Sequence, residues 1–145
     1  MSIPLAIMNA LVPSLKTALA GVVEDRWTVT AWGYNGQQEP AGDKLILPAA
    51  SLYVLECSPD GFKSRLRTYP LVVRVETHNA ADHDPYQADL YAMAHAVSVW
   101  LCASPTITPS GCKVDAVYFD SPPEPMEGVI QGMQWTGTIH VLINA

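Results

Sequence analysis

Charged residues are scarce in this chain of 145 residues. They make up 15% of the sequence, against roughly 25% in an average soluble domain, while 49% of the residues are hydrophobic. Fewer charges leave more apolar surface in need of a partner, which favours assembly into an oligomer, although a well-filled monomer with a neutral polar surface would have the same composition. The length fits one domain, residues 1–145, with one hydrophobic core.

Basic residues are the scarcer of the two charge types. Eight Lys and Arg stand against fourteen Asp and Glu, which gives a formal net charge of −6. Nucleic-acid binding relies on clustered Lys and Arg, so this composition argues against it. Only Arg65, Arg67 and Arg74 lie close together, and strand alternation would place the first two on one face and Arg74 on the other. We interpret them as residues of a solvated strand face.

Long hydrophobic runs are also missing, since none reaches the roughly 18 residues needed to cross a bilayer. The most apolar stretch, Ile3 to Val12, contains Pro4 and is followed by Pro13. A secretory signal begins with a basic region, whereas the first basic residue here, Lys16, comes after the apolar stretch. The sequence therefore predicts no membrane segment and no secretory signal, and we expect the chain to stay where it is made.

Cysteine is rare, and its pattern argues against two kinds of structural site, a disulfide framework and a zinc site. Cys57, Cys102 and Cys112 are odd in number and show no C-x-x-C spacing. Neither a disulfide framework nor a zinc site is indicated. We expect three thiols in a reducing cytoplasm.

Apolar residues near the N-terminus recur at steps of three and four, which predicts an amphipathic helix. They are Leu5, Met8, Val12, Leu15, Leu19 and Val22. We expect this helix to end at Gly21. Pro13 lacks an amide proton and clashes with the preceding turn, so either the helix bends at Val12 or it starts afresh with Pro13 in its first turn.

A second helix is the most strongly signalled element of the chain. Asp84 suits the N-cap, Pro85 suits the first helical position, and Gln87 can complete a capping box. Apolar residues at helical spacing then continue to about Cys102. They are Tyr86, Leu90, Met93, Val97 and Trp100.

Period-two alternation and β-branched residues predict strands between and after these helices. The segments are 27–32, 45–47 with 52–57 broken by Pro48, 62–77, 114–119 and 133–144. Residues 58–61 have the composition of a tight turn, which predicts a hairpin, and Pro70 confines its position to an edge or a bulge.

The last of these segments alternates most clearly. Its apolar residues, Met133, Trp135, Ile139, Val141 and Ile143, share one face, and its polar residues, Gln134, Thr136, Thr138 and His140, share the other. One side of the sheet is therefore expected to face water. Together the elements predict an α+β fold in which a mostly antiparallel twisted sheet packs against two helices, in the order α-β-β-β-α-β-β.

Two irregular loops are our candidates for contacts with partners. Gly33 to Lys44 is interrupted by Gly and Pro, and Asp120 to Gly132 carries apolar residues without a period, which suits a loop that docks on another surface. Trp32 borders the first loop on the face opposite Trp27. The candidate interaction residues are Trp32, Tyr34, Gln37, Glu39, Met126, Val129 and Ile130.

Side chains that could bind a metal gather just before the second helix: His78, Asp82, His83 and Asp84. Capping explains the group better, because Asp84 is used as the N-cap and Asp82 favours the positive end of the helix. Three ligands from one short loop also need a geometry that spacing alone does not supply. We predict no metal and no cofactor.

Signatures of catalysis are missing as well. Neither a G-x-S-x-G elbow nor a G-x-x-x-x-G-K loop is present. His95 and His140 fall on polar faces, and Glu56 and Glu76, which could form a carboxylate pair, are explained by ordinary solvent-facing positions. Three of the four tryptophans, all but Trp32, are expected to fill the core. We predict that the protein is not an enzyme.

The order and size of these elements resemble the tail terminator, or tail completion, proteins of tailed bacteriophages. The resemblance rests on the N-terminal amphipathic helix, the long polar loop after the first strand, the helix opened by D-P-Y-Q and the closing alternating strand. It covers nearly the whole chain but includes no short diagnostic motif. No individual residue therefore carries over from the family.

The resemblance implies a structural virion protein, assembled in the host cytoplasm, that forms a homohexameric ring. Such a ring caps the tail tube, terminates its polymerisation and offers a docking surface to the neck or connector proteins. It implies partners that are copies of the chain itself, the tube protein and the neck proteins, with no nucleic-acid specificity and no membrane. Another neck, head-completion or minor tail protein is the first alternative, and a small-ligand-binding or enzymatic α+β domain is the second.

Overall fold

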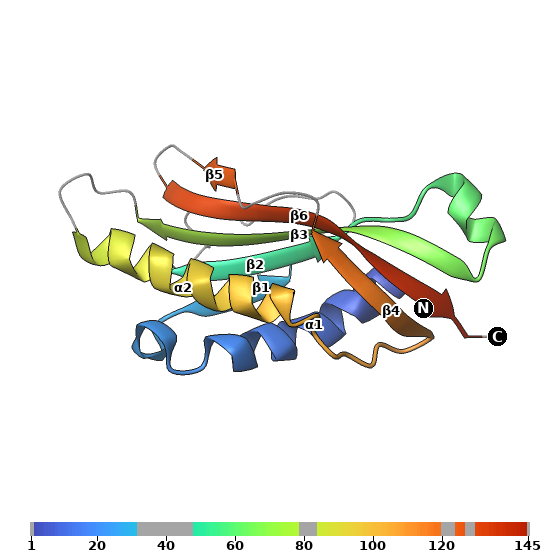
Figure 1. Cartoon of the computed structure of the whole chain (residues 1–145), viewed down its shortest axis with the longest axis horizontal. Helices are drawn as coiled ribbons and strands as arrows, with labels where there is room; N and C mark the ends of the chain where they lie inside the picture. The colour runs from blue at the N-terminus through green and yellow to red at the C-terminus, as the bar shows by residue number, and fades with distance from the viewer. Residues whose placement is uncertain (1, 32–47, 79–83, 120–123, 127–129, 145) are drawn as a thin grey trace.

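The computed structural model describes residues 2–31, 48–78, 84–119, 124–126 and 130–144. Within them, helices α1 (Ile3–Leu19) and α2 (Asp84–Cys102) lie on one side of a twisted sheet (Figure 1). The strands of this sheet are β1 (Thr28–Ala31), β2 (Ala49–Val54), β3 (Leu66–His78), β4 (Cys112–Phe119), β5 (Glu124–Met126) and β6 (Ile130–Ile143). This arrangement confirms the α+β fold and the order of its elements, to which the structure adds the short β5.

The sheet runs in the order β1-β2-β3-β6-β4, with β5 also paired to β6. Its centre is the long antiparallel pair of β3 and β6, which extends from Leu66 opposite Leu142 to His78 opposite Ile130. Strands β2, β4 and β5 also pair antiparallel, and β1 alone pairs parallel, with β2. The prediction of a mostly antiparallel sheet is confirmed.

Alternation along the central strands separates two faces of the sheet. On β3, Tyr69, Leu71, Val73 and Val75 are almost fully buried beneath the helices. Helix α1 covers β1 and β2, and α2 covers β3 and β6. We call the side under the helices the covered face and the other side the open face. The predicted alternation of β6 is confirmed, with Trp135, Ile139 and Val141 buried on the covered face.

Helix α1 differs in detail from the prediction. It passes through Pro13 as one continuous helix, so it does not start afresh there, and Pro13 lies on the exposed side. The helix ends at Leu19, and Gly21 follows its cap with φ +81°, a left-handed conformation that glycine adopts at little cost.

The apolar stripe of α1 is also broader than its spacing indicated. Leu5 is 46% exposed, whereas Ile7 and Leu11, which lie outside the predicted stripe, are fully buried. The helix is covered by both the sheet and α2, so two neighbouring sides of it contact the core. Helix α2 matches its prediction, with Leu90, Met93, Val97 and Trp100 buried.

In the hairpin, β2 begins three residues before the predicted 52–57 segment and ends at Val54, and β3 is shorter than predicted. Residues 59–63 form a 3-10 turn, η2 (Pro59–Lys63), so β3 begins at Leu66 rather than Phe62. Pro70 lies where β2 has ended: the amide of Leu55 donates to the Pro70 carbonyl at 2.9 Å, and β2 pairing starts at Leu71. The missing N–H of Pro70 therefore faces the side on which β3 is locally an edge, as the sequence predicted.

The segment 120–132 is not one loop, which corrects the sequence-based expectation. Strand β5 occupies 124–126 and β6 begins at Ile130, three residues before the predicted start. The sequence shows no alternating pattern there because a strand of three residues is too short to establish one, and its pairing needs only backbone hydrogen bonds.

Among the described helices, none is long and apolar enough to span a membrane.

Candidate interaction surface

The predicted contact residues are mostly beyond the part of the chain that the structure describes. This applies to Trp32, Tyr34, Gln37, Glu39 and Val129. Met126 lies in β5 opposite Gly132, and Ile130 opens β6 opposite His78. Both belong to the sheet backbone rather than to a free loop, while their role in contacts stays a prediction.

The residues considered for a metal site are divided in the same way. Asp82 and His83 lie outside the described residues, His78 ends β3 and Asp84 begins α2. Among the described residues, no group of three His, Cys, Asp or Glu side chains could hold a metal ion.

Glu56 and Glu76 do not form a carboxylate pair. Glu56 is exposed just beyond β2, where its carboxylate accepts from the Cys57 amide at 3.2 Å. Glu76 lies at the other end of the β2–β3 pairing, opposite Ala49, roughly 20 Å along the strand. Only 7% of Glu76 is exposed, so the expectation of a solvent-facing position was wrong for it. Glu76 lies between β2 and β6 rather than on an edge strand.

The three cysteines are unpaired thiols. Cys57 and Cys112 are buried, and burial raises the pKa of the Cys112 thiol. Cys102 is exposed at the last position of α2. A raised pKa disfavours the reactive thiolate, so Cys112 is suited to filling the core rather than to nucleophilic chemistry.

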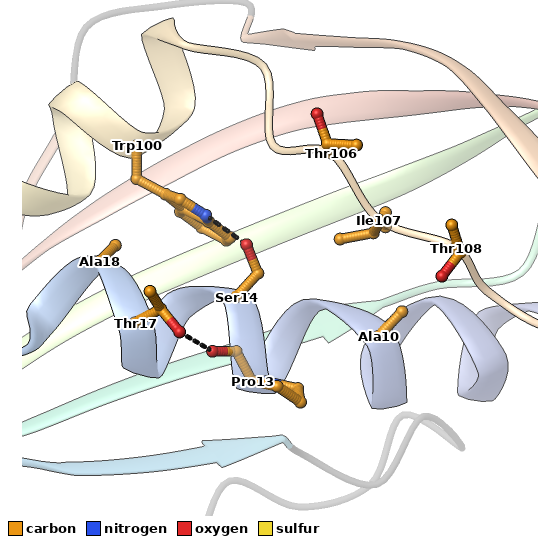
Figure 2. A pocket seen from close by; sticks show the side chains of 9 residues that line it. All are labelled: Ala10, Pro13, Ser14, Thr17, Ala18, Trp100, Thr106, Ile107 and Thr108. Atoms are coloured by element: carbon orange, nitrogen blue, oxygen red, sulfur yellow. Dashed lines mark hydrogen bonds between the residues drawn. The ribbon is translucent and has the colours of Figure 1, made fainter.

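A groove of about 550 Å³ lies between α1 and the connector that follows α2 (Figure 2). Its lining residues are Ala10, Pro13, Ser14, Thr17, Ala18, Trp100, Thr106, Ile107 and Thr108. Trp100 Nε1 donates to the Ser14 hydroxyl at 2.9 Å, and the Thr17 hydroxyl donates to the Pro13 carbonyl at 3.1 Å. None of these lining residues is ionisable. The groove therefore has no ionisable group for acid–base chemistry, and the hydroxyls of Ser14 and Thr17 are already engaged within the chain.

A patch of uncharged side chains occupies the open face at the end of the sheet where β3, β4 and β6 meet. Leu66 stands opposite Leu142, and Tyr118 is opposite Thr138. Their exposed fractions are 57% for Leu66, 40% for Leu142 and 55% for Tyr118. We call the residues Leu66, Thr68, Tyr118, Thr138, His140 and Leu142 the distal patch. Exposed apolar side chains gathered in this way are typical of interaction surfaces.

His140 holds the centre of the distal patch. Its ring nitrogens lie 3.4 Å from the Thr68 hydroxyl and 3.5 Å from the Thr138 hydroxyl. The ring of Tyr118 meets it edge-on, with centroids 5.0 Å apart and an interplanar angle of 87°. Long contacts of this kind orient the imidazole weakly. No carboxylate is among its recorded partners in the described residues, so the arrangement suits a contact surface better than a general base.

A basic side chain, Arg67, lies at the same end of the sheet as the distal patch but on the covered face, where its strand partner is Val141. Arg67 donates to the carbonyls of Ser64 at 3.0 Å and Phe62 at 3.4 Å, and its guanidinium lies 5.1 Å from the centre of the Phe62 ring. Burial raises the pKa of Tyr69, whose hydroxyl accepts from Arg67 at 3.5 Å, and this hydrogen bond opposes the rise. The contacts fix Arg67 in place and leave Phe62 51% exposed.

Sequence reasoning identified some of these positions and missed others. It placed His140 on the polar face of the last strand and His95 on the surface of α2, and both are confirmed. Trp100 and Trp135 are buried and Trp27 packs against the core, also as predicted. It missed the distal patch, because Leu66 and Leu142 become neighbours only through the register of β3 and β6. The signal that could have indicated it is the presence of Leu66 in β3 and of Leu142 in β6 at positions of the otherwise polar face.

Comparison with known proteins identifies the fold. No protein-family model matches the chain, and no curated protein matches it either. Among solved structures, a chain from the virion of a native gene transfer agent (GTA) particle is similar, with a TM-score of 0.58 and 16% sequence identity. The match covers 97% of this chain and 98% of the other. The two chains therefore share a fold over nearly their whole lengths.

Proposed function

We propose that this chain is a structural protein of a virion. The observation that carries the proposal is the shared fold with a chain of the gene transfer agent virion, over 97% of this chain and 98% of that one. In its finer form, the proposal is that the chain forms a ring, a hexamer by resemblance, that caps a tail tube and stops its polymerisation.

Two features of the surface support an assembly role. The distal patch exposes Leu66, Leu142 and Tyr118 on a sheet face that α1 and α2 leave uncovered. Helix α2 also exposes Tyr91 and Val99, at 56% and 55%, on its outer side. Both surfaces suit burial against other protein, because apolar side chains gain free energy when contact removes them from water.

The proposed partners are copies of the chain, the tube protein and the neck or connector proteins, all assembled in the host cytoplasm. A neck or head-completion protein is the first alternative and would differ in partner rather than in architecture. A ligand-binding domain would need a pocket with convergent polar groups, whereas the groove beside Trp100 is open and lined without charges.

Addition of the purified protein to growing tubes of the tube protein from the same virion tests the function. Negative-stain imaging would measure tube length with and without the protein. We expect shorter tubes with a visible cap at one end, and a ring in solution or at the tube end. Tubes that keep growing, together with a strictly monomeric mass at high concentration, would count against a terminator. Binding to connector proteins without an effect on tube growth would favour the neck alternative.

A further inference from the structure

The charges of this chain are unevenly distributed along its long axis. Residues 59–68, 112–116 and 140–144 form the end that carries the distal patch and η2, at the right of Figure 1. They include four basic side chains and two acidic side chains, a formal +2 within a chain whose net charge is −6, which leaves −8 on the rest. We call this segment set the basic end.

Apolar and basic groups are combined on the basic end. Lys113 is paired with Leu142, which is paired with Leu66, so an exposed lysine flanks two exposed leucines on the open face. Lys63 is exposed at the end of η2. Arg65 Nε donates to the Ile143 carbonyl at 3.2 Å, which ties that guanidinium to the sheet. A partner that fits this end has apolar side chains beside carboxylates.

The opposite end of the long axis presents carboxylates. There the turn η1 (Val22–Asp25) joins α1 to β1 and contacts α2 (Figure 1). Val23, Glu24 and Asp25 have φ of +51°, +56° and +59°, a left-handed run that is costly for residues other than glycine. The Glu24 side chain is 86% exposed.

The positive charge nearest to this turn is already engaged. Arg26 lies 3.4 Å from an Asp89 carboxylate oxygen and 3.8 Å from Glu24. The Asp25 carboxylate accepts from the Gly21 amide at 2.7 Å and is otherwise open to solvent at an exposed position. Val22 and Val23 are partly buried next to it. The turn therefore offers net negative charge beside a small apolar surface.

We propose that the basic end of one copy docks on the η1 turn of a second copy, head to tail. The proposal rests on the proposed ring-forming function and names the two surfaces that meet. A contact between different surfaces at opposite ends of one chain is heterologous, and such contacts close into a ring when the rotation between copies allows it. The second copy is the occupant that the charges favour, since the chain itself carries the acidic surface that complements its basic end.

Charge reversal at the two ends tests the contact. The variants are K63E/K113E at the basic end and E24K at the turn, with assembly measured by sedimentation velocity at low salt. Each variant alone should associate at least roughly tenfold more weakly than the unchanged chain, because attraction becomes repulsion. An equimolar mixture of the two variants should recover assembly, since each reversed end then meets a reversed partner.

The matched control is K16E, which reverses an exposed lysine of α1 outside both surfaces. It should assemble like the unchanged chain, and circular dichroism should show that all variants are folded. Normal assembly of both end variants, or no recovery in the mixture, would overturn the head-to-tail contact. If the unchanged chain caps tubes while the reversals have no effect, the contact fails and the proposed function stands. If the unchanged chain neither assembles nor caps tubes, the function itself fails.

Discussion

The covered and open faces of the sheet are built from the same strands, yet they serve different purposes. On β6, Ile139 and Val141 are fully buried under the helices, whereas Leu142, the next residue, is 40% exposed on the open face. The apolar residues of the covered face are buried in the core of the chain itself. Those at the end of the open face are not, because neither helix of the chain covers them.

This difference shows which apolar residues hold the fold and which are available to a partner. The covered face buries its side chains against α1 and α2 in one continuous core. The open face carries polar side chains such as Arg74, which is hydrogen-bonded to Gln134 across β3 and β6, and at the distal patch it exposes large apolar ones. Substitutions on the two faces should therefore separate stability from assembly.

The largest effect on stability is expected at Ile139. Ile139→Ala removes a fully buried side chain from the covered face and leaves a cavity, so the free energy of unfolding should fall by about 2–5 kcal/mol. Urea denaturation followed by circular dichroism would measure it. Thr138→Ala, one residue away on the open face, is the matched control and should change stability by less than about 1 kcal/mol. Equal losses in the two variants would contradict the distinction between the faces.

A smaller loss is expected at Gly132, where the open face has no space for a side chain. A Cβ atom at this position would lie 2.6 Å from the Val75 carbonyl oxygen and 3.2 Å from Glu76 Cγ. Gly132→Ala should therefore force β3 and β6 apart locally and cost about 1–3 kcal/mol. The same denaturation experiment measures the loss, with Thr136→Ala on β6 as the control. An unchanged urea midpoint for Gly132→Ala would mean that β3 and β6 accommodate the added Cβ atom without loss of stability.

Between the helices, the hydrogen bond from Trp100 to Ser14 should contribute about 1 kcal/mol. Ser14→Ala removes the acceptor, and the open groove allows water to replace part of it. Thr17→Ala, which removes only a bond to the carbonyl of Pro13 in the same helix, is the control and should have less effect. Thermal unfolding of both variants would compare them, and a larger loss for Thr17→Ala would contradict this assignment.

The smallest effect is a change in alkaline sensitivity. Burial raises the pKa of Tyr69 in the folded chain above its usual value of about 10, and Arg67 opposes the rise. The neutral phenol is thus favoured by folding. Its contribution to stability is present below about pH 10 and is lost as the pH rises through the folded pKa. Tyr69→Phe should lose less stability between about pH 9 and about pH 11 than the unchanged chain, as measured by urea midpoints. Equal losses of stability with rising pH in Tyr69→Phe and in the unchanged chain would show that Tyr69 does not cause the alkaline sensitivity.

Local signals predicted most of the fold. The spacing of Leu90, Met93 and Val97 and the alternation of 133–143 each depend on neighbours within a few turns or strand positions, so the sequence contains them in full. The strand β5 and the early start of β6 were missed for the opposite reason. Pairing of short segments depends on backbone hydrogen bonds with a distant strand, which leave little trace in side-chain pattern.

The candidate site was predicted less well. The expected contact loops fall largely outside the described residues, and the distal patch was not foreseen. Glu76 was assigned to solvent because a single strand carries no information about whether it lies at the edge or the centre of a sheet. The structure places Glu76 in the centre of the sheet, between β2 and β6.

By itself, the sequence determined the two amphipathic helices, the alternation of the long strands and the shortage of charge, because these depend only on residue type and spacing. Tertiary structure alone decided that Leu66 meets Leu142, and that the basic end and the η1 turn lie at opposite ends of the long axis. The physical reason is that register and strand order bring together residues more than seventy positions apart, and no local period encodes that distance.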